Sequence, residues 1–142
     1  MTGPYVPNEL LSRLVGWRMY SVEFVVNAYV QLRFDADGPA GLGPLGPAVL
    51  NCYAWPAIHF DEREWAESDL GYADALRRLT PGIVTSTVEA TGTGLRIELD
   101  TGSVVLHPAL GDVDVEIAEL SGFADRAWMV WRPGEDSFED LV

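Results

Sequence analysis

The sequence predicts a mainly β protein with minor α content (α+β), in which two repeated β-meander halves form a sandwich or a small barrel with one linking helix. Several segments alternate apolar and polar residues with the period of two that a half-buried strand requires. A pattern of strand, hairpin, strand, loop and strand occurs twice along the chain. A length of 142 residues, of which 48% are hydrophobic, suits one domain over residues 1–142 with its own core.

The first half is predicted to begin with a short helix over residues 8–15, with Asn8 as a possible cap. Alternating apolar residues then predict strands over 18–27 and 30–34, which a turn near Asn27 joins into a hairpin. Glycine and proline dominate residues 38–47, which therefore form a loop before the next predicted strand, 48–60.

A linking helix is predicted over residues 61–79, because the apolar side chains there recur at helical spacing. Asp61 and Glu64 have the spacing of a capping box at its start. Pro81-Gly82 ends this segment, and five strands follow, at 83–90, 95–100, 103–107, 113–120 and 127–132. Residues 135–142 form an acidic tail.

An internal repeat is the main organising feature, covering approximately residues 16–60 and 82–120. Gly16 is followed by a valine-glutamate pair that ends at Glu23, and Gly82 is followed at the same spacing by a pair that ends at Glu89. Each pair belongs to a predicted strand, which is followed by a second strand and then by a glycine-containing loop. Glu23 and Glu89 are equivalent in this repeat, and we expect both side chains to face outward.

The charge of the chain argues against direct nucleic-acid binding. It has 22 acidic residues against nine arginines and no lysine, for a formal net charge of −13. Binding to phosphates needs a basic stripe, whereas these arginines are scattered along the chain. An acidic surface favours solubility and association with a basic protein partner.

The same composition predicts a soluble, cytoplasmic protein without a membrane span. No apolar run approaches the roughly 20 residues that a spanning helix needs. Residues 1–7 lack the basic and apolar segments of a secretory signal. The lone cysteine, Cys52, has no internal partner for a disulfide and is expected to be a small buried residue.

The first candidate site is a row of three carboxylates, Asp112, Asp114 and Glu116, which alternate with apolar residues. On a strand these side chains project from one face at intervals of about 7 Å. Such an acidic face suits an arginine- or lysine-rich protein partner. The structural alternative is a solvated face, or an edge strand whose charges prevent aggregation.

The second candidate site gathers His59, Asp61 and Glu64 with the distant His107. An imidazole with carboxylates suits a general acid and base, or the wall of a ligand pocket between the repeat halves. Helix capping is the structural explanation for Asp61 and Glu64. The sequence contains neither a Gly-x-Ser-x-Gly nor a His-Glu-x-x-His motif, so we predict no catalytic residue, no metal site and no cofactor.

Several turn and strand motifs resemble those of a functionally uncharacterised family of small actinobacterial proteins with a duplicated β motif. They are Gly16 with Val22-Glu23, Leu32-Arg33-Phe34-Asp35, Pro81-Gly82, the run from Leu95 to Gly102, and Trp131-Arg132-Pro133-Gly134. The chain is also similar in general appearance to immunity proteins of bacterial toxin systems. This similarity implies a binding function and no catalytic residues.

Three functions follow as hypotheses from these residues. The first is a non-enzymatic protein-binding domain, such as an immunity-type inhibitor, that engages a basic partner through its acidic face. The second is a small-molecule-binding domain or enzyme with a pocket between the repeat halves. The third is a homodimeric scaffold that pairs exposed strand edges.

Overall fold

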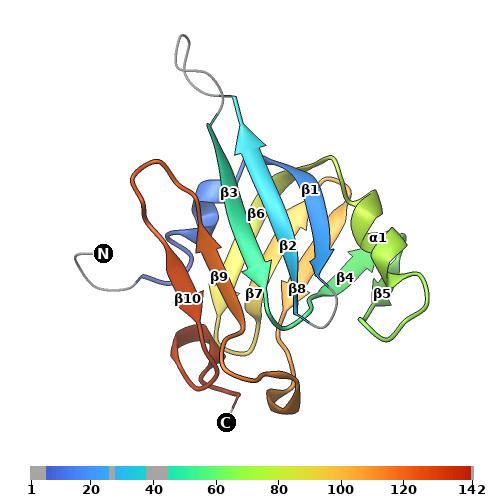
Figure 1. The fold of residues 1–142 in the computed structure, drawn as a ribbon, viewed down its shortest axis with the longest axis vertical. Coiled ribbons are helices and arrows are strands. Elements are labelled where there is room, and N and C mark those ends of the chain that lie inside the picture. Colours follow the sequence, from blue (N-terminus) through green and yellow to red (C-terminus); the bar gives the residue numbers. More distant parts are fainter. Residues whose placement is uncertain (1–5, 26–27, 38–44, 142) are drawn as a thin grey trace.

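The structure is a computed structural model that describes residues 6–25, 28–37 and 45–141. The protein is mainly β, with one ten-stranded antiparallel sheet and one short α-helix, α1 (Tyr72–Arg78), in the described part of the chain (Figure 1). The strands are β1 (Arg18–Val25), β2 (Tyr29–Ala36), β3 (Leu45–Cys52), β4 (Ala57–Phe60), β5 (Arg63–Trp65), β6 (Gly82–Ala90), β7 (Gly94–Leu99), β8 (Gly102–Leu106), β9 (Ala118–Ser121) and β10 (Met129–Trp131).

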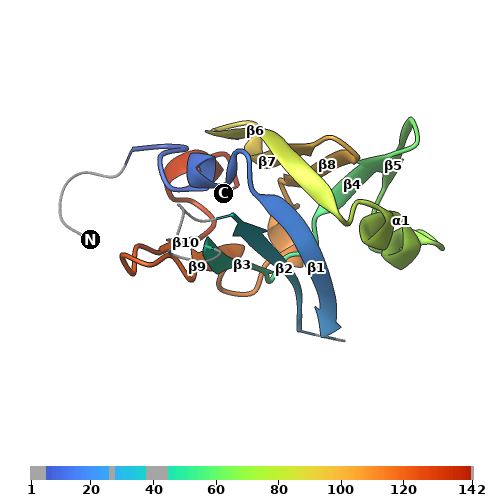
Figure 2. The same ribbon diagram turned by 90° about the horizontal axis from the view of Figure 1, so that it is seen from above.

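The strand order is β10-β9-β3-β2-β1-β6-β7-β8-β4-β5, so β10 and β5 are the two edges of an open sheet. The small-barrel alternative is therefore wrong. Two antiparallel meanders, β1-β2-β3 and β6-β7-β8, form the centre of the sheet. They meet through only two residue pairs, Arg18 with Ile83 and Met19 with Gly82. The sheet bends at this junction, so that the β6-β7-β8 part lies over the β1-β2-β3 part (Figure 2).

Two hairpins cross from one part of the sheet to the other. The β4-β5 hairpin follows β3 in the chain, yet β4 pairs with β8. The β9-β10 hairpin follows β8, yet β9 pairs with β3. Each part of the sheet is thus completed by a hairpin that comes from the other part, which ties the two together by backbone hydrogen bonds as well as by packing.

The core lies between the two parts of the sheet. It is filled by the inward-facing side chains of strands that alternate as predicted. In β2, Val30, Leu32 and Phe34 are fully buried while Arg33 is exposed. The equivalent inward residues of β7 are Leu95, Ile97 and Leu99. Short helices cover the open ends: Leu11 and Leu14 enter from the 3-10 helix η1 (Leu11–Leu14), and α1 contributes Tyr72, Ala75 and Leu76.

The predicted helix over residues 61–79 is wrong, because its first part is a β-hairpin. Asp61 and Glu62 have φ values of 56° and 61° and form a two-residue turn between β4 and β5. Neither residue caps a helix there. The pairing of β4 with β8 buries Ile58 and outweighs the local helical preference of this segment. Gly71, at φ 95°, stands before α1, which retains only the last third of the predicted span.

Two further expectations need correction. The predicted strand 48–60 is divided, because β3 ends at Cys52 and β4 begins only after Pro56, which has no amide hydrogen for a ladder. The predicted helix 8–15 is reduced to η1, which Asn8 does not cap. Residues 38–44 of the glycine- and proline-rich loop, and Asn27 of the first hairpin turn, lie outside the described residues.

The tail that begins at residue 135 packs back on the sheet. Its 3-10 helix η3 (Asp136–Phe138) contacts β6 and β7. Phe138 is fully buried and Leu141 is 8% exposed. The acidic residues of the tail are carried on a segment that two apolar side chains anchor.

The turn between β4 and β5 provides a test of the hairpin. A non-glycine residue in the left-handed region is strained by about 1 kcal/mol, which glycine avoids. We expect Glu62→Gly to raise the free energy of unfolding by about 0.5–1 kcal/mol, measured by urea denaturation. Glu139→Gly is the control, because Glu139 is exposed with φ −60° and glycine there is expected to destabilise. If both variants destabilise the protein, the left-handed conformation of Glu62 in this turn is contradicted.

Candidate functional site

Asp112, Asp114 and Glu116 do not lie on a strand, so the predicted strand 113–120 is wrong over its first half. Asp112 ends the 3-10 helix η2 (Leu110–Asp112), and β9 begins only at Ala118. The reason is the length of the neighbouring strands. Ala118 pairs with the last residue of β3, Cys52, and with the last residue of β10, Trp131. Residues before Ile117 therefore extend beyond both partners and have no ladder to join.

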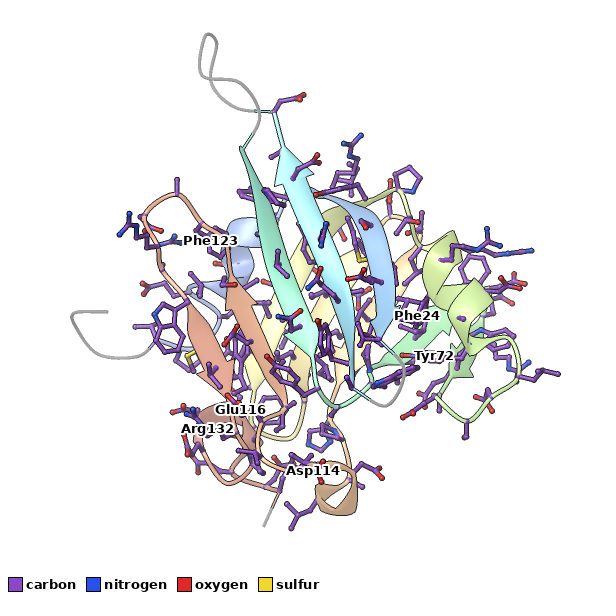
Figure 3. The ribbon with its side chains drawn as sticks, in the orientation of Figure 1. Phe24, Tyr72, Asp114, Glu116, Phe123 and Arg132 are labelled. Carbon is purple, nitrogen blue, oxygen red and sulfur yellow. The ribbon has the colours of Figure 1, made fainter. Side chains whose placement is uncertain are left out.

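The three carboxylates instead belong to a loop over residues 110–116, which we call the acidic loop. Asp112 and Asp114 are exposed, and Glu116 is partly buried with one oxygen 3.6 Å from the Arg132 guanidinium. Figure 3 shows Asp114, Glu116 and Arg132 at the same end of the molecule. The same loop has two exposed apolar side chains, Leu110 at 44% and Val115 at 69%. The acidic loop therefore combines negative charge with exposed apolar surface.

A depression of about 360 Å³ lies on one side of the acidic loop. Tyr29 and Tyr53 form its wall, with ring centroids 5.9 Å apart in an edge-to-face arrangement. Asp112, Asp114 and Glu116 all line it, so the structure brings the three predicted residues together although they do not share a strand. Burial and the nearby carboxylates raise the pKa of the Tyr53 hydroxyl, which keeps it protonated.

A second depression, which we call the groove, lies on the other side of Asp112 and has a volume of about 340 Å³. It contains three of the four residues of the second predicted set, His59, Glu64 and His107. His59 Nε2 lies 3.4 Å from Glu64 Oε2 across the β4-β5 pair. His107 Nε2 lies 2.6 Å from Asp140 Oδ2, and this hydrogen bond holds the pKa of the Asp140 carboxyl below its usual range.

The two histidines occupy opposite ends of the groove and do not form one reacting centre. His59 pairs with Ser103 in β8, whereas His107 follows the end of that strand. Ser103 and His107 are four positions apart in extended chain, which corresponds to about 13 Å. Asp61, the fourth predicted residue, lies outside the groove, in the β4-β5 turn beside a neighbouring depression. His59 and Glu64 line that depression as well, so the structure brings His59, Asp61 and Glu64 to one depression and leaves His107 apart from them.

Glu89 is a buried charged group that the sequence pattern did not predict. Its side chain is 5% exposed, whereas we expected it to face outward; Glu23, its predicted equivalent, is exposed. Glu89 accepts hydrogen bonds from the Trp131 indole N–H at 2.9 Å and from the Asn8 backbone N–H at 2.9 Å. Burial raises the pKa of the Glu89 carboxyl, against the effect of these two hydrogen bonds.

A β-bulge explains why Glu89 points inward. The register between β6 and β7 shifts between Val84 and Ser86, which adds one residue to β6 and reverses the alternation after it. Val88 is therefore 39% exposed while Thr87 and Glu89 are buried. The sequence of β6 carries no glycine or proline at the bulge that indicates this change.

The remaining chemistry of the described residues is limited. Burial raises the pKa of the Cys52 thiol, which makes it a poor nucleophile. No group of three or more histidine, cysteine and acidic residues with metal-binding geometry occurs in the described ranges. Within the same ranges, no helix is long and apolar enough to cross a membrane.

Comparisons of the chain with protein-family models, with curated proteins and with solved structures found no match.

The Glu89 cluster leads to a stability prediction. A glutamine at this position has only one acceptor oxygen, so either the Trp131 or the Asn8 N–H loses its partner. We expect Glu89→Gln to lower the free energy of unfolding by about 1–3 kcal/mol at neutral pH, the usual cost of one buried unsatisfied donor. Urea denaturation measures this change. Glu23→Gln is the matched control and is expected to change stability little, because Glu23 is exposed.

The raised pKa of Glu89 also fixes the sign of a pH effect. Folding favours the protonated carboxyl, so this group contributes stability below its unfolded pKa of about 4.5 and loses that contribution as the pH rises through its folded pKa. Glutamine does not titrate. The destabilisation caused by Glu89→Gln is therefore expected to be greater at pH 4 than at pH 7, and the opposite trend would contradict a raised pKa.

Proposed function

We propose that this chain is a non-enzymatic protein-binding domain whose acidic loop engages a basic protein partner. The observation that carries the proposal is the exposure of Leu110 and Val115 in the same loop as the carboxylates of Asp112, Asp114 and Glu116. An immunity-type inhibitor of a basic toxin is one class of protein that works in this way.

Charge and apolar surface have separate uses in such an interface. Unpaired carboxylates attract a basic partner and orient it before contact, with an effect that falls with salt. Exposed apolar side chains then contribute area that is buried on binding. Asp112 and Asp114 take part in none of the ion pairs of the described residues, so their charge is available to a partner.

Two alternatives have weaker support. A small ligand or substrate is favoured by the presence of His59, Glu64 and His107 in one groove, but the two histidines are too far apart to act on one bond. A homodimeric scaffold is favoured by the open sheet edges β5 and β10. Each edge strand has only three residues, and a net charge of −13 opposes self-association.

We also infer that the two meanders are copies of one repeated unit, packed as a sandwich. Each meander has a bulge early in its first strand, between Met19 and Ser21 in β1 and between Val84 and Ser86 in β6. Each is followed by a hairpin that pairs with the other meander. This correspondence supports a duplication in which the two bulges are 65 residues apart, against 66 for Gly16 and Gly82.

Neutralising the acidic loop tests the proposed function. Tagged wild-type protein and the triple variant Asp112→Asn, Asp114→Asn, Glu116→Gln are used to capture proteins from host lysate at about 50 mM and about 150 mM salt. We expect the wild type to retain a stoichiometric basic protein at the lower salt. For that partner, once purified, the triple variant is expected to bind about tenfold more weakly, as loss of several rim charges predicts.

The matched control neutralises three exposed acidic residues outside the loop, Glu9→Gln, Glu23→Gln and Asp37→Asn. Its affinity for the purified partner is expected to stay within about twofold of the wild type. Equal weakening by both triple variants would show a general charge effect, and an affinity independent of salt would contradict the proposed mechanism.

A further inference from the structure

The groove beside the acidic loop has a floor of small and apolar side chains. Ala57 of β4 and Val105 of β8 are paired across the two strands, and both line the groove. Their neighbours Ile58, Val104 and Leu106 are buried on the opposite face. Ala66, Pro108 and Ala109 complete the apolar part of the lining. The groove thus lies on the outer face of the sheet, over the β4-β8 pair.

One wall of the groove is held rigidly by aromatic packing. Trp55 lines the groove, and its ring stacks on Tyr72 with centroids 5.9 Å apart. Phe24 packs against the same indole at 5.9 Å, and the Tyr72 hydroxyl donates a 2.6 Å hydrogen bond to the Pro56 carbonyl. Figure 3 shows Phe24 and Tyr72 on this side of the molecule. A wall fixed in this way needs no reordering when a ligand binds.

The charged groups of the groove are all acidic. Glu64, Glu67 and Asp112 line it, with two imidazoles and no arginine among the lining residues. Glu64 stands beside His59 at one end, and at the other the Asp112 backbone N–H donates to the carbonyl of Ala109, two residues after His107. An anionic ligand, such as nucleic acid, would meet repulsion here, whereas a cationic group would meet a carboxylate at each end.

The dimensions and the charge together select a basic, extended occupant. The length of about 13 Å along β8, from the residue opposite His59 to His107, corresponds to about four residues of extended chain. Lysine and arginine side chains place a charged head on a carboxylate while their aliphatic stems cover an apolar floor. β4 is hydrogen-bonded on both sides, by β5 and β8, so the occupant binds through side chains and not as an added strand.

We propose that this groove binds an extended peptide segment of a partner protein, with one arginine or lysine at the Glu64 end and another at the Asp112 end. The proposal rests on the proposed function and names the part of the partner that lies beside the acidic loop. A second copy of this chain is disfavoured as the occupant, because it has nine basic residues against 22 acidic ones.

The test is a titration of the full chain, labelled with nitrogen-15, with a capped peptide of three arginines alternating with alanines, at about 50 mM salt. We expect saturable shift changes at the backbone amides of Ala57, Glu64, Val105 and His107. The double variant Glu64→Gln, Glu67→Gln is expected to weaken binding at least fivefold. The matched double variant Glu9→Gln, Glu23→Gln removes two exposed carboxylates outside the groove and the acidic loop, and it is expected to stay within twofold of the wild type.

The outcomes separate this proposal from the proposed function. Shift changes confined to Tyr29, Tyr53 and residues 114–116 would overturn the groove while supporting the acidic loop as the binding surface. Equal weakening by both double variants would overturn it in favour of diffuse attraction. The absence of any saturable shift change would also overturn the groove proposal. Capture of a partner by the acidic loop would be a separate result, which tests the proposed function. The amide spectrum of each variant shows whether it is folded.

Discussion

The narrow junction between β1 and β6 is the constraint on which the rest of the structure depends. Besides two residue pairs, it has the backbone hydrogen bonds from Gly16 N–H to the Val84 carbonyl and from Val84 N–H to the Trp17 carbonyl, each 2.8 Å. Gly82 is required there, because a Cβ would lie 2.4 Å from the Leu79 carbonyl oxygen. So short a junction lets the sheet bend and bring its two apolar faces together.

The candidate binding surfaces are consequences of how the chain crosses between the two parts of the sheet. After β8, the chain must reach β3 in the other part before β9 can pair, and the acidic loop is the connection. Because β3 and β10 both end level with Ala118, this connection stays unpaired and exposed. The opposite crossing, from β3 to β4, places Trp55 and Pro56 at the wall of the groove.

Glu89 is a buried charged residue that links the two parts of the sheet by hydrogen bonds. It lies on β6, and it accepts a hydrogen bond from Trp131 on β10, in the other part of the sheet, and one from Asn8, which precedes η1. The side chains of Asn8 and Thr87 add a 2.7 Å hydrogen bond beside it. A buried carboxylate without a cation costs free energy, and these donors offset part of that cost. The cluster therefore favours one arrangement of both terminal segments on the sheet.

The sequence by itself determined the features that depend on local pattern. The alternation in β2 and β7, the two meanders and the stop at Pro81-Gly82 follow from side-chain period and turn chemistry. The pattern also pointed to Asp112, Asp114 and Glu116 as neighbours, which the structure places together in one depression.

Only the tertiary structure decided which strands each segment meets. The Asp61-Glu62 turn replaces a predicted helix because β8 offers β4 a partner, and residues 112–116 are a loop because their neighbours end too early. Contacts between residues distant in sequence also decide the bulge that buries Glu89. The same holds for the groove that has His59 and His107 in its lining. Local periodicity carries no information on such partners, because hydrogen bonds between strands are chosen by the whole sheet and not by the segment that forms them.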